Sequence, residues 1–151
     1  MVNLTNNIIL NLLNNENLTV VKNELLEINE KSSDYGLILS SKDVEEVIKS
    51  RKNTLKNYSR IDLNMEVTKK LIEILYTSPY TNQDDYVELI NDLQDIFYYL
   101  KNETLDEISD DDIIEEISQF YEKSSGRIDN VQNLCEKFIK DYRLSRVIKY
   151  E

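Results

Sequence analysis

The sequence predicts an all-α fold, a single domain in which about six to seven amphipathic helices form an orthogonal or bundle-like array. Apolar residues recur at helical spacing along almost the whole chain. Only two Gly and one Pro occur in 151 residues, so the hairpins of an all-β fold would lack their usual turn residues. No internal repeat or low-complexity linker divides the chain, and residues 1–151 are therefore expected to form one domain.

Two helices are expected in the first part of the chain. One covers about residues 3–14 and places leucine and isoleucine side chains on one face and asparagines on the other. The next covers about residues 18–30 and also has one apolar face. Gly36 lies in the connection that follows, so the second helix should end before it.

The third and fourth helices are expected on either side of a short connection. Ser40 and Asp43 have the spacing of a capping box, which starts a helix over about residues 42–58. The fourth helix covers about residues 65–77, and Asn64 is its expected N-cap. Its wide apolar face predicts a central position in the core.

The C-terminal half is expected to contain three more helices. The longest starts near Asn82, and the next begins at Ser109, whose spacing to Asp112 is again that of a capping box. Three consecutive aspartates then occupy the first helical turn, where negative charge is stabilised by the helix dipole. The last helix continues to about Arg143, and a short basic tail of about residues 143–151 follows.

The charge of the chain is concentrated in one segment. Residues 78–122 contain fourteen Asp and Glu and one base, Lys101, whereas the whole chain has a net charge of −11. This balance argues against a protein that binds nucleic acid or an anionic membrane directly. Cys135 is the only cysteine, so no internal disulfide can form, and we expect a cytoplasmic protein without a membrane span or signal peptide.

Catalytic and metal-binding patterns are not found in the sequence. The chain contains no histidine, which removes Ser/His/Asp and Cys/His arrangements and the usual zinc sites. Cys135 falls in an apolar stripe, where a thiol is usually inert. No glycine-rich phosphate loop occurs, and the acidic run does not have the spacing of a calcium loop. No cofactor and no metal are therefore predicted, and a catalytic role is the less favoured interpretation.

Arg51 is the first candidate site residue. It lies near the centre of the apolar stripe of the predicted helix 42–58. Burying its charge without a partner would cost several kcal/mol. We therefore expect a carboxylate or a set of backbone carbonyls beside it, and a bound anion is the functional alternative.

The other candidates lie on the longest predicted helix. Its acidic residues form a row opposite the apolar stripe, which is most simply a solvated face and alternatively a binding face. Two adjacent tyrosines fall outside the main apolar stripe, where they are either covered by flanking helices or exposed as interface anchors. The candidate binding residues on this helix are Asp85, Glu88, Asp92, Asp95, Tyr98 and Tyr99.

Part of the chain resembles a known family. The segments SSKDVEEVIKSRKNTLKNYSRIDL and VTKKLIEILYTSPYTNQDDYVELINDLQDIFYYLKNETLDEISDDDIIEEI look like an uncharacterised bacterial, clostridial-type family of small helical proteins of unknown function. The resemblance spans about residues 40–121. Its members have a Gly-Arg-Ile-Glu-Phe-Gly-like stretch where this chain reads SRIDLN from Ser59 to Asn64, so both glycines are replaced. Because the family has no established activity, it implies no site residues.

Three hypotheses of function follow from the sequence. The first is a small acidic cytosolic protein that binds a protein partner or a second copy of itself and has no catalytic activity. The second is an acidic decoy that imitates nucleic acid and occupies the basic cleft of another protein. The third is an enzyme or anion-binding protein that uses Arg51 together with carboxylates.

Overall fold

The computed structural model describes residues 18–150, and it confirms the predicted all-α fold. No strand occurs in this part of the chain. A first helical segment covers residues 18–27. It is followed by α2 (Asn29–Ser32), α3 (Ser41–Asn57), α4 (Glu66–Tyr76), α5 (Tyr86–Glu103), α6 (Asp110–Lys123) and α7 (Ile128–Tyr150), with 3-10 turns at Ser33–Tyr35 and Gln83–Asp85.

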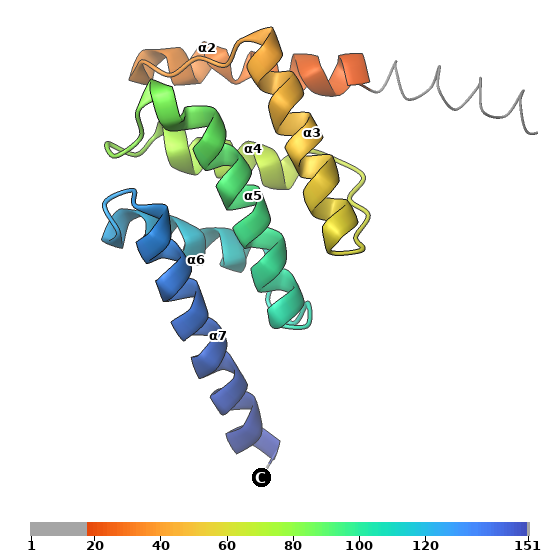
Figure 1. Ribbon diagram of the computed structural model, residues 1–151, viewed down its shortest axis with the longest axis vertical. Coiled ribbons are helices and arrows are strands. Elements are labelled where there is room, and N and C mark those ends of the chain that lie inside the picture. Colours follow the sequence, from red (N-terminus) through yellow and green to blue (C-terminus); the bar gives the residue numbers. More distant parts are fainter. Residues whose placement is uncertain (1–17, 151) are drawn as a thin grey trace, which may run out of the picture.

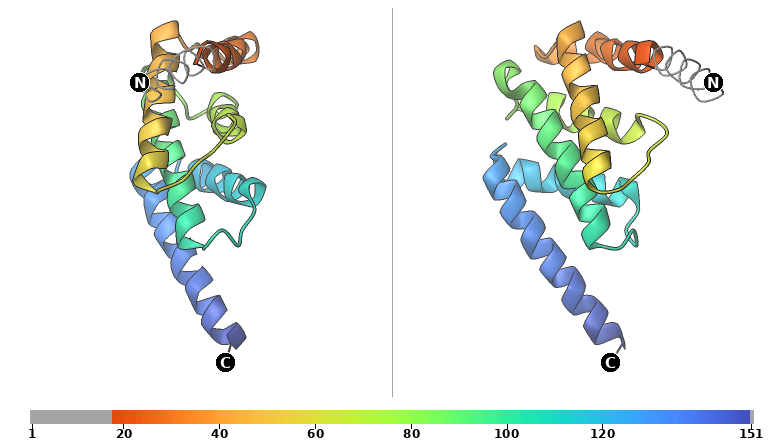
Figure 2. Two further views of the ribbon diagram at one scale, coloured as in Figure 1. Left: turned by 90° about the vertical axis from the view of Figure 1, so that its right-hand side faces the viewer. Right: turned by 45° about the vertical axis from the view of Figure 1, so that its right-hand side comes forward.

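The helices form two layers that cross each other (Figures 1 and 2). Helices α3, α5 and α7 make up one layer and run in the same direction, while residues 18–32, α4 and α6 make up the other. The chain alternates between the layers, and α5 contacts α3, α4, α6 and α7. The C-terminal part of α7 projects beyond the other helices (Figure 1).

The core lies between the two layers. Helix α5 contributes most to it, and Tyr86, Ile90, Leu93 and Leu100 are completely buried. Burying a large apolar side chain contributes about 1.5 to 3 kcal/mol each, so the contacts of α5 account for much of the stability. We expected α4 to have a central position in the core. Its apolar side chains are buried, as expected. The helix with contacts in both layers, however, is α5.

One buried polar cluster ties three helices together. Thr68 Oγ1 in α4 donates to Gln94 Oε1 in α5 at 2.7 Å, and Gln94 Nε2 donates to the Val47 carbonyl in α3 at 3.4 Å. Because a buried amide that lacks partners is costly, these bonds restrict how the three helices can slide against each other.

The predicted helix starts are largely confirmed. At α3 the Ser40 side chain accepts from the Asp43 amide, and the Asp43 carboxylate accepts from the Ser40 amide, a complete capping box. At α6 the Ser109 hydroxyl accepts from the Asp112 amide at 3.1 Å. Asn64 lies one residue outside the N-cap of α4, but its side chain still accepts from the Glu66 amide.

Other predicted boundaries differ from the structure. The segment expected to be one helix over residues 18–30 is interrupted at Ile28 and ends at Ser32. The Asn29 side chain pairs with both backbone groups of Leu39 and so fixes the connection that follows. The expected helix start near Asn82 is a 3-10 turn, and α5 begins at Tyr86. Residues 143–150, expected as a tail, continue α7. The helix predicted over residues 3–14 lies outside the described residues.

None of the helices in residues 18–150 is both long enough and apolar enough to cross a membrane.

Candidate functional site

The connection between α3 and α4 is an irregular segment held by buried polar groups. Residues 59–64 are here named the anchored loop. Arg51 Nη2 donates to the carbonyl oxygens of Asp62, at 3.0 Å, and Asn64, at 2.8 Å, and it lies 3.9 Å from Asp62 Oδ2. These contacts confirm the expectation that Arg51 has a carboxylate and backbone carbonyls beside it. Its partner is Asp62, which lies outside the acidic segment 78–122.

Tyr98 in α5 forms a further hydrogen bond with the anchored loop. Its hydroxyl donates to Asp62 Oδ2 at 2.5 Å, and only 4% of the residue is exposed. Burial and the neighbouring Asp62 carboxylate both raise the pKa of Tyr98, so the hydroxyl keeps its proton and remains a donor. Tyr98 is therefore covered by its neighbours rather than exposed as an interface anchor.

Arg60 binds the N-terminal end of the anchored loop to the end of α5 and the residues that follow it. Its Nε donates to Asn102 Oδ1 at 2.6 Å, and its Nη2 donates to both carboxylate oxygens of Asp106 at 2.8 and 2.9 Å. Ser59 begins the loop with φ at 53°, a left-handed conformation that glycine adopts more readily. The turn is thus formed here without a glycine.

Two apolar side chains of the anchored loop point into solvent. Ile61 is 89% exposed and Leu63 is 93% exposed, the highest values among the large apolar residues described. Because Arg51 and Arg60 hold the loop in one conformation, the loop does not have to become ordered when a protein binds these side chains. Exposed apolar residues on a fixed backbone are typical of a protein interface.

The neighbouring α5–α6 connection is also held by a buried cation. Lys101 is 7% exposed, and its Nζ donates to the Ile108 carbonyl at 2.7 Å and pairs with Asp110 at 2.9 Å. Leu105 and Asp106 have φ values of 55° and 59°, which side chains rarely adopt without support. The single base of the acidic segment thus neutralises and shapes the loop between its two helices.

A second candidate surface is a groove between α3 and α5, named here the acidic groove. It has a volume of about 450 Å³ and contains five carboxylates but no Lys or Arg. Its lining residues are Asp43, Glu46, Gln83, Asp84, Val87, Glu88, Asn91 and Asp92. Within residues 18–150, these five carboxylates form no ion pair.

Asp92 shows the electrostatic effect of this arrangement. Burial, and then the charges of Glu88 and Asp95, raise the pKa of its carboxyl group above the ordinary value. The charged form of Asp92 is therefore less favourable in the folded chain than in the unfolded one, and it destabilises the fold at pH values above its folded-state pKa.

Asp92→Asn is accordingly expected to increase the free energy of unfolding at pH 7 by up to about 1 kcal/mol, a value reduced by the solvent exposure of the side chain. The gain should decrease as the pH falls through the folded-state pKa and disappear below about pH 3, where the carboxyl of the unfolded chain is also protonated. Urea denaturation of dilute protein at several pH values measures both effects. Glu115→Gln, at an exposed position of α6, is the control, and an equal gain in both variants would contradict the prediction.

The rest of the predicted acidic row lies in different surroundings. Asp85 is exposed before α5, and Asp95 lies beside Tyr58, whose pKa is raised to about 12 by burial and by Asp95. The Tyr99 hydroxyl donates to Glu136 Oε1 in α7 at 2.6 Å, and this bond and burial raise the pKa of Tyr99 to about 12. Only Glu88 and Asp92 of the row line the acidic groove.

A smaller hollow lies between α5 and α7. It has a volume of about 300 Å³, and Tyr99, Cys135 and Glu136 are among its lining residues. Burial raises the pKa of the Cys135 thiol to about 12, so almost no thiolate forms near pH 7. In the part of the chain that the structure describes, no group of three His, Cys, Asp or Glu side chains is arranged to hold a metal ion.

The sequence did not identify the anchored loop as a site. Periodicity carries no information about a non-helical segment, and the contacts of Arg60 join residues that are 42 and 46 positions apart. One available signal was the alternation of charged and apolar residues in Arg60, Ile61, Asp62 and Leu63. This alternation places charged side chains on the protein and apolar ones in solvent, the reverse of the usual arrangement.

The fold and its surfaces define a class: an all-helical protein of two crossing layers with an anchored apolar loop and an acidic groove. Residues 24–147 match the model of a family of unknown function, DUF6323. The chain therefore belongs to this family, which, as the resemblance predicted, is one of unknown function. It matches none of the curated proteins and none of the solved structures with which it was compared.

Proposed function

We propose that this protein is a cytosolic, non-catalytic protein-interaction protein whose contact surface is the anchored loop. The observation that carries the proposal is the exposure of Ile61 and Leu63 on a backbone fixed by Arg51 and Arg60. An interface anchor that is already ordered loses little conformational entropy on binding. The partner is expected to offer an apolar pocket for these two side chains.

The charges of α3 suggest what surrounds that pocket. Lys49, Lys52 and Lys56 are exposed and follow one another at helical spacing on the helix that leads into the loop. They form no ion pair within the described part of the chain. A partner with carboxylates at the rim of its apolar pocket would complement this helix, and such rim charges mainly accelerate association.

Ile61→Asp/Leu63→Asp tests the proposal. Both positions are exposed, so the free energy of unfolding should change by less than about 0.5 kcal/mol. Loss of two anchors should weaken partner binding by at least about 30-fold, the effect of one interface hot spot. Affinity purification from the native cells, followed by titration of the recovered partner, measures this effect.

Val20→Asp is the matched control, because Val20 is also exposed but lies on the helical segment 18–27. It should bind the partner like the unaltered chain. If the double variant recovers the same partner with the same affinity, the anchored loop is not the contact surface.

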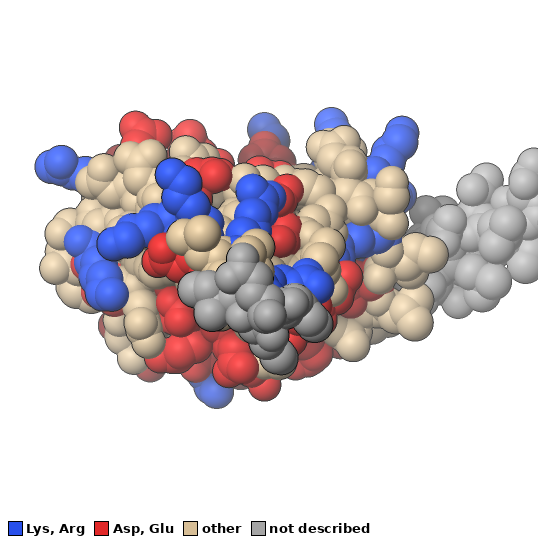
Figure 3. Space-filling model, turned by 90° about the horizontal axis from the view of Figure 1, so that it is seen from below, with Lys and Arg blue, Asp and Glu red and all other residues tan. Residues whose placement is uncertain are grey.

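Features of the charged surface weigh against the decoy hypothesis. At the end of the molecule where α3 and α5 end and α7 projects (Figure 1), acidic residues are paired with Arg60, Lys101, Arg143 and Arg146. Seen from that end, basic side chains alternate with acidic ones (Figure 3). This end of the molecule therefore lacks the uniform negative charge of a nucleic-acid duplex.

The hypothesis that Arg51 binds an anion has less support, because its charge is already paired. Arg51 has two carbonyl oxygens and the Asp62 carboxylate as partners.

We also propose that the described helices belong to one domain, since their buried apolar side chains form one continuous cluster.

A further inference from the structure

The outer face of α7 carries a stripe that has no partner within residues 18–150. Its members recur with the alternating spacing of three and four residues that lets one helix pack against others. Leu144 is 57% exposed and Val147 is 55% exposed, although both are apolar. The stripe, named here the α7 stripe, consists of Lys137, Lys140, Leu144 and Val147.

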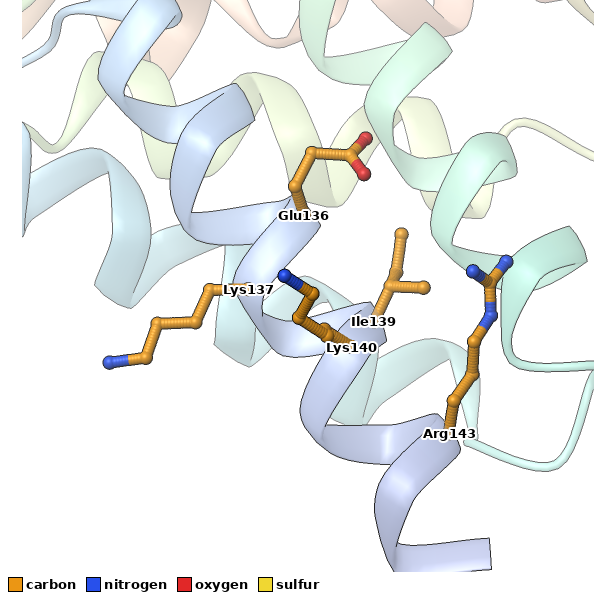
Figure 4. Close-up of a pocket in the computed structure, with 5 residues that line it drawn as sticks. All are labelled: Glu136, Lys137, Ile139, Lys140 and Arg143. Carbon is orange, nitrogen blue, oxygen red and sulfur yellow. The ribbon is translucent and has the colours of Figure 1, made fainter. Parts of the chain in front are cut away.

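The α7 stripe faces away from the core. Ile139 is buried on the inner side of α7, and Tyr142 contacts the carbonyl of Thr104 from that side at 2.9 Å. Figure 4 shows Ile139 and Arg143 pointing toward α5, with Lys137 pointing away from it. Both stripe lysines are exposed and form no ion pair within residues 18–150.

The acidic groove has the chemistry that this stripe requires. It contains five carboxylates without a cation, and Val87 adds an apolar surface to its lining. The stripe contains two lysines without an acidic residue, followed by two apolar side chains. The groove lies beside the first half of α5, and the stripe runs from the middle of α7 toward its C-terminal end, so the two surfaces lie toward opposite ends of the layer formed by α3, α5 and α7 (Figure 1).

We propose that the chain forms a dimer in which the α7 stripe of each copy lies in the acidic groove of the other. Because the groove is acidic and the stripe is basic, and the two lie toward opposite ends of the layer, a two-fold rotation places opposite charges against each other in both contacts. The rotation also reverses the helix direction, so the α7 helix of the second copy runs antiparallel to α3 and α5. Each dimer thus contains the same contact twice.

The net charge of −11 works against the association of two copies at long range. The dimer must therefore depend on the local pairing of lysines with groove carboxylates. An experiment can therefore distinguish specific pairing from overall charge repulsion. Replacing groove acids with lysines brings the net charge closer to zero, but it also removes the pairing. Specific pairing predicts that such a variant dissociates, whereas general charge repulsion predicts that it associates more strongly.

The test uses the full chain and two double variants. Glu88→Lys/Asp92→Lys makes the groove basic, and Lys137→Glu/Lys140→Glu makes the stripe acidic. Analytical ultracentrifugation should show the unaltered chain as a dimer and each variant alone as a monomer. An equal mixture of the two variants should form a heterodimer, because both of its contacts again join opposite charges.

The control Glu115→Lys/Glu122→Lys changes the net charge equally at exposed positions of α6, and it should remain a dimer. Circular dichroism confirms that each variant is folded, and Glu88→Gln/Asp92→Asn replaces the groove variant if reversal disturbs the fold. The Ile61→Asp/Leu63→Asp chain should also remain a dimer, since the anchored loop takes no part. A monomeric unaltered chain at concentrations up to about 1 mM, or a mixture that stays monomeric, would overturn the proposal.

Discussion

Gly126→Ala is expected to lower the free energy of unfolding by about 2 to 4 kcal/mol, combining backbone strain with overpacking. Gly126 has φ at 78°, and an added Cβ would lie 2.9 Å from Tyr80 Cβ and 3.2 Å from the Tyr121 hydroxyl oxygen. The Tyr121 hydroxyl also hydrogen-bonds with Thr81 at 2.7 Å. The turn between α6 and α7 is thus in close contact with the segment that precedes α5, and the Tyr121–Thr81 hydrogen bond opposes a shift that would make room for the added methyl group.

Gly36→Ala is the matched control for this change. Gly36 has nearly the same φ, 80°, but an added Cβ would meet no atom within 4 Å. Only the left-handed backbone cost of about 1 kcal/mol should remain. Urea denaturation of both variants measures the difference, and equal losses would show that the contact with Tyr80 is not limiting.

Arg51→Met is expected to lower the free energy of unfolding by about 2 to 3 kcal/mol, because a partly buried carboxylate and two carbonyls lose their donor. Methionine retains most of the apolar length of the side chain, so little packing is lost. Lys52→Met, at the next and exposed position, should change stability by less than about 0.5 kcal/mol. Chemical denaturation provides the comparison.

The same variant has a second readout in the anchored loop. The Arg60 amide donates to the Leu55 carbonyl at 2.8 Å, and its hydrogen exchange reports how often this turn opens. Exchange should be faster in Arg51→Met than in Lys52→Met. A stability loss without faster exchange would mean that Arg51 stabilises α3 but does not hold the loop.

The fold was predictable because each helix is specified locally. The capping box of Ser40 and Asp43 and the Ser109 cap follow from spacings of three residues. Apolar periodicity likewise identified the buried faces of α3, α5 and α6. Boundaries were predicted less well, as in the segment 18–32, which is interrupted at Ile28 and is tied to Leu39 through the Asn29 side chain.

The candidate sites were predicted less completely, because they depend on contacts between distant residues. Angular arithmetic placed Asp85, Glu88, Asp92 and Asp95 in one row, but it could not show which neighbouring helix each acid would meet. Residues of α3 line the acidic groove together with two of them, Glu88 and Asp92, whereas Asp95 is exposed beside Tyr58. Arg51 was identified correctly as needing partners, yet its partner Asp62 lies in a segment without periodicity.

The parallel direction of α3, α5 and α7 has a consequence for where charge can accumulate. Helix dipoles that point the same way place partial positive charge together at one end of the layer and partial negative charge at the other. Asp43, Asp84 and Glu88 lie at the beginnings of α3 and α5, whereas Lys101 and Arg60 lie at the opposite ends of these helices. The helix dipoles therefore partly offset the negative charge of Asp43, Asp84 and Glu88, whereas Glu46 and Asp92, which lie beyond the first turns of α3 and α5, receive little of this stabilisation.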